Sequence, residues 1–495
     1  MPDNVEIQKF TATLEGGGIP IESAVVSHSV DKFPQANVMG HFVADGGLEE
    51  TTVSTPLTTS VMSKIAELQR NRFESRTTPD FKLVINSGRT DLKFNGFLSA
   101  PMTELYRGGI HNKLAAVQEA ALLDALNISI YARRVVSIVE KKNSPGDKSK
   151  QQSNPTEDEE ARSAAASGDI IKLILRCTDL LWENYESALA EASDNDKVLL
   201  SNQHAINEAP RKIWIGILLD SQVDFKSIKS AIAADKAVAT QLISTTWDIL
   251  KNPVSGFWNT IRHLMSTFHM TYVPSLSGNG NGKFIRADTR VAEPEGALTV
   301  SIDSINLVDG SRNILPLGGV VMRHSLIPSS NERNNKSSPI LASYPKPLKS
   351  GFIHQEPTPR WLTIKDSQAI MGSEVDSSEL SDDPPLILSL ARYVADKSKV
   401  AKFLLKSAGL GNSIMDEICE VAYKELRLGS STGVITEPLD LSRTDALGKR
   451  MTINIAGGDS SFVAFISNVT HRISLQNGKK LSSSTQLELS HVEYT

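Results

Sequence analysis

The chain of 495 residues is long enough for two or three domains, and its composition, 40% hydrophobic and 22% charged, is typical of a globular protein. A formal net charge of −5 gives no basic footprint for tight nucleic-acid binding. The N-terminus, MPDNVEIQ, lacks the regions of a secretory signal, and no apolar run approaches the roughly 18 residues of a membrane span. These features predict a protein that is soluble when made and has no stable membrane anchor.

The two cysteines, Cys177 and Cys419, lie far apart in segments with helical periodicity. The sequence therefore predicts buried, unpaired thiols and a reducing assembly compartment rather than a disulfide framework.

The stretch from Gly18 to Gly47 predicts two strands joined at Asp31-Lys32-Phe33-Pro34. Pro34 cannot donate to a strand ladder, which suits a connection. In each strand every second residue falls on one face; these positions are Ala24, Val26, His28 and Val30, then Ala36, Val38, Gly40 and Phe42.

A second antiparallel pair is predicted over residues 81–98, with its turn at Asn86-Ser87-Gly88-Arg89-Thr90. The following segment, residues 113–131, is expected to enter as a strand and become a helix that covers one mouth of a small barrel. Its apolar residues recur at helical spacing; they are Leu114, Val117, Ala121, Leu122, Ala125 and Leu126.

The order of these elements resembles the first tube-like barrel of phage baseplate hub proteins and of the valine-glycine-repeat spike proteins of contractile injection systems. The pattern is a hairpin S-H-S-V-x-x-x-P-x-A closed by Asp-Gly, a Leu-x-Phe-x-Gly strand, and a helix with Ala-x-Leu-Leu-Asp before a tyrosine. The matching residues are Ser27, His28, Ser29, Val30, Pro34, Ala36, Asp45, Gly46, Phe94, Gly96, Leu122, Leu123, Asp124 and Tyr131.

Residues 136–168 are expected to form a mobile linker or loop, because this segment is poor in apolar residues and carries mixed charge runs and prolines. The acidic run at 157–160 fits a solvated face better than a metal or catalytic site.

Residues 169–275 predict a large helical insertion. Asp169 suits the N-cap of a helix to Ala192, and Pro210 and Pro253 are expected to interrupt later helices. Those helices are predicted at 197–207, 225–250 and 255–271. Four of the five tryptophans lie here, which fits either a separate core or a docking surface, with the core favoured; they are Trp182, Trp214, Trp247 and Trp258.

Strand patterns resume after the helices and lead into a second helical region. Strands are predicted at 297–307 and 319–326, and loops at 275–282, 327–360 and 366–385. Two helices are expected at 386–408 and 413–428, the second with Ser413 as N-cap and Gly429 as its stop.

The tail from Met451 predicts strands again and carries a second resemblance to hub proteins. Their later barrel ends with an F-x-x-x-V-x-x-V-x-H strand and a T-x-L-x-L-S-H-V strand. Phe462 to His471 matches the first pattern with Ile466 in place of valine. The second is matched by Thr485, Leu487, Leu489, Ser490, His491 and Val492.

The motifs of common enzyme and metal sites are missing from the sequence. There is no His-Glu-x-x-His, no Cys-x-x-Cys and no Walker loop. Gly458-Asp459-Ser460 with His471 downstream fits a hairpin turn, because no helix follows the serine. His263 and His269, predicted on one helix, are six residues apart, a poor spacing for a shared metal. We therefore predict no catalytic, cofactor-binding or metal residue, no cofactor, and a protein that is not an enzyme.

The predicted fold class is α+β, with two tube-protein-like antiparallel β-barrels and a large helical insertion. The expected division is 1–135 for the first barrel with a covering helix, 136–168 for the linker and 169–275 for the helical insertion. It continues with 276–380 for the first part of the second barrel with long loops, 381–430 for a helical pair and 431–495 for the strands completing that barrel.

The resemblance implies a structural hub of a phage tail baseplate: a trimeric adaptor that joins a six-fold tail tube to a three-fold central spike. It also implies part of the channel for genome ejection, with lumen-facing side chains that are polar or acidic. The implied partners are the homotrimer, the tail tube protein ring, the central spike protein and other baseplate proteins, with the tape measure protein as a further candidate and DNA only in passage. The implied location is the tail baseplate of a virion, assembled in the host cytoplasm.

Two other functions stay open. One is a baseplate-associated peptidoglycan hydrolase with residues 169–271 as its catalytic domain, which would need two carboxylates in a cleft. The other is a receptor- or carbohydrate-binding tail module, which would expose aromatic platforms in its β regions. Only Trp361 lies outside the helical insertion among the tryptophans.

Overall fold

The structure of the chain is a computed structural model. It describes residues 9–14, 17–19, 23–42, 81–86, 90–106, 109–124, 126, 158–221, 223–251, 256–275, 281–301, 303–308, 319–323, 337–344, 352–354, 385–389, 411–428, 431–458, 460–476 and 480–494. In these ranges, no helix combines the length and the apolar character needed to cross a membrane.

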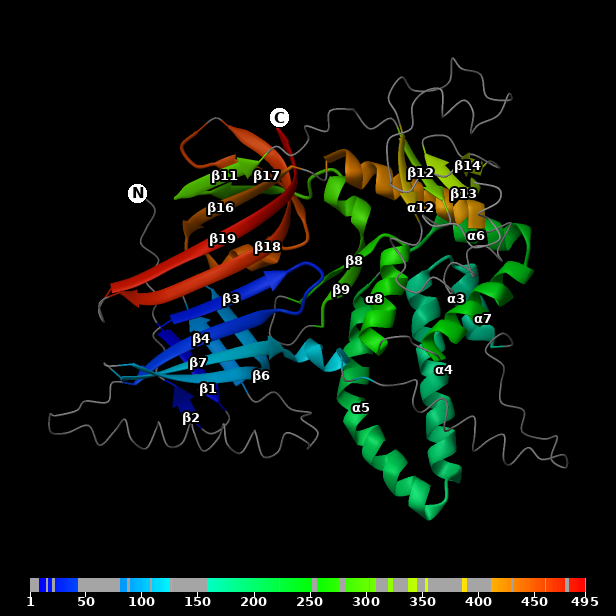
Figure 1. The fold of residues 1–495 in the computed structure, drawn as a ribbon, viewed down its shortest axis with the longest axis horizontal. Coiled ribbons are helices and arrows are strands. Elements are labelled where there is room, and N and C mark those ends of the chain that lie inside the picture. Colours follow the sequence, from blue (N-terminus) through cyan, green and yellow to red (C-terminus); the bar gives the residue numbers. More distant parts are fainter. Residues whose placement is uncertain are drawn as a thin grey trace.

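The predicted α+β class is confirmed: the large sheet lies on one side of the molecule and most helices lie on the other (Figure 1). A 13-stranded sheet joins both ends of the described chain, and its pairs are antiparallel apart from β10 with β17. Its N-terminal strands are β1 (Lys9–Leu14), β2 (Gly17–Ile19), β3 (Ser23–Ser29), β4 (Gln35–Phe42), β5 (Phe81–Asn86), β6 (Asp91–Tyr106) and β7 (Gly109–Gln118). Its later strands are β10 (Ala297–Val300), β11 (Ser304–Val308), β16 (Thr432–Pro438), β17 (Arg450–Ile455), β18 (Ser461–Gln476) and β19 (Lys480–Tyr494).

The sheet consists of two arrays of strands. The N-terminal array runs β3-β4-β7-β6-β5-β1-β2, and the C-terminal array runs β10-β17-β18-β19-β16-β11. In each array the two outermost strands are consecutive in the chain, β2 with β3 and β10 with β11. Among the described strands, no hydrogen-bonded pair closes either array on itself.

Each array has its own apolar core, because alternate side chains of its strands point inward. In β3 the buried positions are Ala24, Val26 and His28, as the alternation predicts. The N-terminal core includes Phe81, Leu83, Ile85, Leu92, Phe94 and Leu114. The C-terminal core includes Val300, Ile435, Ile453, Phe462, Ile466, Val469, Leu487 and Leu489.

Strand β18 belongs to both arrays. On one edge, its first part pairs with β17 and residues 468–474 pair with β3. On the other edge, β18 pairs with β19. Ile473 of β18 consequently lies in the N-terminal core, beside Leu439 and Leu441.

The helices surround a third core, which contains the buried Trp214 and Trp258. They are α3 (Glu159–Ala166), α4 (Ile170–Glu191), α5 (Asp194–Asp220), α6 (Lys226–Ala234), α7 (Ala237–Lys251) and α8 (Phe257–Thr267). The short 3-10 helix η2 (Glu119–Asp124) extends from β7 into this core through Ala120 and Leu123. We call α3 to α8 together with η2 the helical body.

The remaining elements connect the helical body to the sheet. They are the hairpin β8 (Met270–Val273) and β9 (Lys283–Arg286), the 3-10 helices η4 (Ala287–Val291) and η6 (Leu441–Ala446), and α12 (Gly411–Leu428). A small sheet, β14-β13-β12-β15, lies beside α12 (Figure 1). Its strands are β12 (Gly319–Arg323), β13 (Ser337–Tyr344), β14 (Phe352–His354) and β15 (Pro385–Ser389).

Several local predictions are wrong in the helical region. Residues 159–166 form α3 within the predicted linker, because Asp158 caps a turn that buries three alanines. Pro210 lies inside α5 rather than between helices. The helix expected at 225–250 divides where Asp235 accepts a hydrogen bond from the Ala237 N–H, 2.9 Å away. The last expected helix ends at Thr267, and β8 follows it.

The strand regions also need corrections. Within 113–131 the described residues start as strand, because residues 113–117 alternate in period two and pair with both β4 and β6, and the helical part that is described is η2. The strand at 297–307 is two strands, β10 and β11, and the loop at 327–360 contains β13 and β14. The helix at 386–408 begins as strand β15, parallel to β12. Asp45, Gly46, Tyr131, Trp361 and all of residues 366–384 and 390–410 lie outside the described residues.

Candidate functional site

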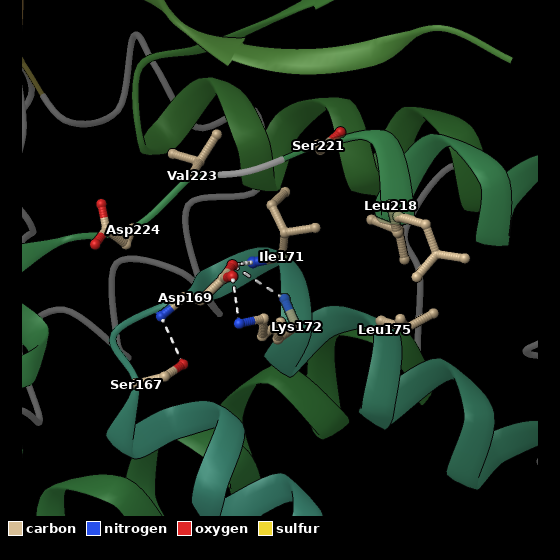
Figure 2. Close-up of a pocket in the computed structure, with 10 residues that line it drawn as sticks. Ser167, Asp169, Ile171, Lys172, Leu175, Leu218, Ser221, Val223 and Asp224 are labelled. Atoms are coloured by element: carbon tan, nitrogen blue, oxygen red, sulfur yellow. Dashed lines mark hydrogen bonds and ion pairs between the residues drawn. The ribbon is translucent and has the colours of Figure 1, made fainter.

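Figure 2 shows a cavity of the helical region, in which the catalytic groups of a hydrolase would have to lie. It measures about 560 Å³ and lies between the start of α4 and the end of α5. Its lining combines apolar side chains such as Leu175 and Leu218 with two carboxylates, Asp169 and Asp224.

The polar groups of this cavity have structural tasks. The Asp169 carboxylate accepts the N–H groups of Ile171 and Lys172 at 3.0 and 3.2 Å, and it lies 3.6 Å from the Lys172 ammonium (Figure 2). Asp169 is therefore the helix cap that the sequence predicts.

The two hydroxyls of the cavity are engaged as well. Ser167 Oγ donates to the Ala164 carbonyl, and Ser221 Oγ donates to the Ile217 carbonyl and accepts the Phe284 N–H. Ser167, Asp169 and Ser221 of this lining are thus all engaged in hydrogen bonds with backbone groups. Within the described ranges, no group of three or more His, Cys, Asp and Glu side chains could hold a metal ion.

The predicted turn at 31–34 connects both arrays to the helical body. The Asp31 N–H donates to the Tyr272 carbonyl at 2.7 Å, and the Tyr272 N–H donates to Asp31 Oδ1 at 2.9 Å. Phe33 inserts beside Trp258 and Tyr272, with ring centroids 5.0 and 5.9 Å away. The Val30 N–H donates to the carbonyl of Ser467 in β18.

An ion pair between Arg290 and Glu425 lies at the centre of this region. Arg290 Nη2 is 3.7 Å from Asp31 Oδ2 and donates to Thr271 Oγ1 at 2.6 Å. Burial raises the pKa of Glu425, but the neighbouring His269, 3.4 Å away, and Arg290 outweigh it and hold that pKa below its usual range. We call Asp31, His269, Tyr272, Arg290, Glu425 and His491 the joint.

The joint also concentrates backbone strain. Asp31, His269 and His491 have φ values of 63°, 50° and 54°, and they are the non-glycine residues with positive φ in the described ranges. They come from three separate segments and all interact with Arg290 or Glu425. Left-handed backbone outside glycine costs about 1 kcal/mol or more and persists only where the surroundings impose it.

Helix α12 holds a second ionic group two turns before the joint. Glu417 accepts Ser227 N–H and Oγ–H at 3.2 and 2.7 Å, and Arg286 Nη1 donates to it at 2.8 Å. The pairs Arg286–Glu417 and Arg290–Glu425 therefore tie α12 to both the helical body and the sheet.

The corner between β10 and β11 has its own buried ion pair. Glu437 of β16, 2% exposed, accepts Arg443 Nε at 2.7 Å, and Arg443 Nη2 donates to the Thr299 carbonyl. Burial raises the pKa of Glu437, and the Arg443 charge opposes that rise. This pair holds the bend at which the chain crosses from one outer strand to the other.

The strands that carry the two sequence resemblances are neighbours in the sheet. His28 of β3 lies opposite Val469 of β18, and His471 of β18 lies opposite Val26. Both histidines are buried, and His471 Nδ1 lies 3.0 Å from Thr485 Oγ1. Gly96 is required by the close approach of β7, because a Cβ there would lie 2.2 Å from the Val117 carbonyl oxygen.

Other residues singled out in the sequence lie apart from these sites. Cys177 and Cys419 are buried, as predicted, and form no disulfide with each other, and burial raises the pKa of the Cys177 thiol to about 12. His269 belongs to the joint and not to a helix shared with His263. Arg290 and Glu425 could not be predicted from the sequence, because they pair across 135 positions and no local pattern marks either residue.

No protein-family model and no curated protein sequence matches this chain. Its fold is similar to a tail protein from Neisseria meningitidis MC58, at 9% identity over 97% of this chain and 95% of that one, with a TM-score of 0.38. It is also similar to the 43 kDa tail protein of prophage MuSo2 from Shewanella oneidensis, at 7% identity over 98% and 99% of the chains, with a TM-score of 0.42.

A third similar structure is the E. coli c3393 protein, described as a type VI secretion component with structural similarity to the T4 tail proteins gp27 and gp5. It shares 7% identity over 98% of this chain and 77% of that one, with a TM-score of 0.31. The structural neighbours are thus phage tail and injection-system proteins, the class that the sequence resembles.

Proposed function

We propose that this chain is a structural hub of a phage tail baseplate, a trimeric adaptor between a six-fold tail tube and a three-fold central spike. The observation that carries the proposal is the repeated arrangement of the two arrays. Each array has its own core, and each begins and ends with strands that are consecutive in the chain.

This connectivity supports two barrels. Only three residues separate Ile19 from Ser23, and three separate Val300 from Ser304, so each gap spans at most about 14 Å. Flat arrays of six or seven strands would place their outer strands about 24–29 Å apart at the usual spacing. Each array must therefore curl until its outer strands approach each other.

Two barrels in one chain give a trimer six similar units. A ring of six can meet a six-fold tube on one side, while the three chains meet a three-fold spike on the other. In this proposal residues 1–135 supply the first barrel, and residues 276–380 with 431–495 supply the second. The tube ring, the spike and other baseplate proteins are the partners, the virion tail is the location, and DNA crosses the central channel.

The outer edge of β11 is a candidate contact between copies. It pairs only with β16 among the described strands, and its Ile305 and Val308 are 38% and 53% exposed. Free strand edges with apolar side chains favour pairing with another chain. A head-to-tail contact of this kind closes into a ring when the rotation is three-fold.

Native mass spectrometry of the purified chain, and the copy number in intact tails, test the proposal. We expect three copies, and we expect Val308→Lys to weaken the trimer about tenfold or more because it places a charge on the edge. Val198→Lys is the matched control, since Val198 is 64% exposed on the helical body. A monomer or dimer in the assembled particle would contradict the hub proposal, and a lytic band on a zymogram would favour the hydrolase.

A further inference from the structure

The outward face of the sheet carries few charges where the two arrays meet. A row of six directly paired hydroxyl or amide side chains crosses it from β11 to β4, in the order Ser304, Thr436, Gln486, Thr470, Ser27 and Gln35. Directly paired residues point to the same side of a sheet. The row is therefore one band across both arrays, in which Thr470 is 6% exposed and the other five side chains are more exposed, and we call it the neutral band.

The rows beside the neutral band have the same character. Among the outward positions with described side chains in β3, in β4, in residues 468–474 of β18 and in residues 482–490 of β19, only Arg472 and Glu488 are charged, and their charges cancel; Glu493, 53% exposed, lies beyond this stretch of β19. Only Val25 and Met39 among them are apolar. The strands run side by side across the sheet in Figure 1.

Side chains of this face bind one another. Thr470 Oγ1 donates to Ser27 Oγ at 3.1 Å, and Ser27 Oγ donates to Asn468 Oδ1 at 3.2 Å. Ser467 Oγ, at the bulge in β18, donates to the Glu488 carbonyl at 3.0 Å. Part of the hydrogen-bonding capacity of the face is thus used within the sheet.

This composition argues against a binding surface of the usual kinds. A surface that holds DNA needs several lysines or arginines to neutralise phosphates and release counterions. A surface that anchors a protein needs aromatic or large apolar side chains at its centre. The outward positions described above offer neither, so a polyanion can move along them without being held.

We infer that the neutral band lines the central channel and that duplex DNA passes along it without binding. The inference rests on the proposed hub. It adds that the outward face carrying the neutral band faces the lumen, and that the low charge of this face lets DNA slide. The other outward surfaces of the N-terminal array are less suited, because β5 and β6 carry Lys82 and Lys93 there.

The test places positive charge on this face in the assembled particle. The triple variant Gln35→Lys, Asn37→Lys and Glu488→Lys uses three exposed positions. We expect DNA ejection to slow about tenfold or more, because each lysine adds a phosphate contact. The control, Asp194→Lys with Ser201→Lys and Asn202→Lys, makes the same change of charge at exposed positions of α5, and ejection should keep its normal rate.

Assembly and position are measured separately from ejection. Particles of each variant are first checked for three hub copies, so that a failure of the hub proposal is seen as a wrong copy number. Asn37→Cys should react with a polymer-linked maleimide in the purified chain and be protected in the intact tail, while Asn202→Cys reacts in both.

Three results would contradict the inference even when the particles contain three copies of the chain. They are normal ejection from correctly assembled triple-variant particles, reaction of Asn37→Cys in the intact tail, and capture of a protein instead of DNA by a photo-crosslinker at Asn37 during ejection. Slowed ejection together with protection and DNA capture would support it.

Discussion

Two buried histidines lie where the N-terminal and C-terminal arrays meet. Burial lowers the pKa of His28 to about 4 and that of His471 to about 3, and the proximity of His28 lowers the pKa of His471 further. Both rings are therefore neutral in the folded protein near pH 7. In the unfolded chain they take up protons near the ordinary pKa of about 6.5.

These pKa values predict a loss of stability in mild acid. Because the folded state resists protonation, the full stability is present above about pH 6.5 and decreases as the pH falls toward 4, by about 3 kcal/mol for His28. Thermal melts between pH 8 and pH 4 should show this decrease, and His28→Leu should make it shallower.

The ion pair of Arg290 with Glu425 should matter more than pairs on the surface of the same helix. Glu425→Gln leaves Arg290 without its partner in a site where both side chains are 19% exposed, and we expect a loss of about 3 kcal/mol in denaturant unfolding. Glu420→Gln removes the more exposed pair with Lys424 and should cost under about 0.5 kcal/mol. Equal effects of the two substitutions would show that the joint contributes no more than surface charge.

At the scale of elements, β18, which lies near the C-terminus, stabilises the N-terminal array. Ile473, 2% exposed, packs in the N-terminal core, whereas Ile466 of the same strand packs in the C-terminal core. Position along one strand thus decides which core a side chain supports.

Ile473→Ala and Ile466→Ala should separate these two roles. Each removes buried apolar volume and should cost about 2–4 kcal/mol. In hydrogen exchange, Ile473→Ala should increase exchange in β3, β4 and β7, while Ile466→Ala should increase it mainly in β16, β17 and β19. Identical exchange patterns would mean that the arrays share one cooperative unit.

Elements with a strong local signal could be predicted from the sequence. The alternation in β3 and β4 and the cap at Asp169 are examples, because each depends on residues a few positions apart. The short apolar run Leu386-Ile387-Leu388 was assigned to a helix, since such runs fit either type of element until a partner strand is known.

The sites depend on contacts that no local pattern contains. Ser27 and Thr470 bind each other across 443 positions, and Arg290 and Glu425 pair across 135. The resemblance pointed correctly to the strands of His28 and His471, but only the register shows that these strands are neighbours. The joint could not be predicted from the sequence, because the residues around a single arginine or glutamate do not indicate which distant residue it pairs with.

At the scale of the whole molecule, the N-terminal array is incomplete without the end of the chain. Strand β3 has β4 on one edge and β18 on the other, so removal of β18 exposes the outer edge of the N-terminal array and takes Ile473 from its core.

A chain truncated after Gly457 should therefore lose structure at both ends. We expect strands β3 to β7 to become sensitive to limited proteolysis and the strand signal in circular dichroism to fall, compared with the full-length chain. A truncated chain whose N-terminal strands resist protease would show that the first array folds alone.

The position of β18 also sets an order of events on the ribosome. The edge of β3 that β18 covers is synthesised roughly 430 residues before its partner, which at usual translation rates is a wait of about 20–90 s. During that time the nascent polypeptide presents an open strand edge with which other chains could pair. Interrupted translation products would lack β18 and would leave one edge of β3 without its partner strand.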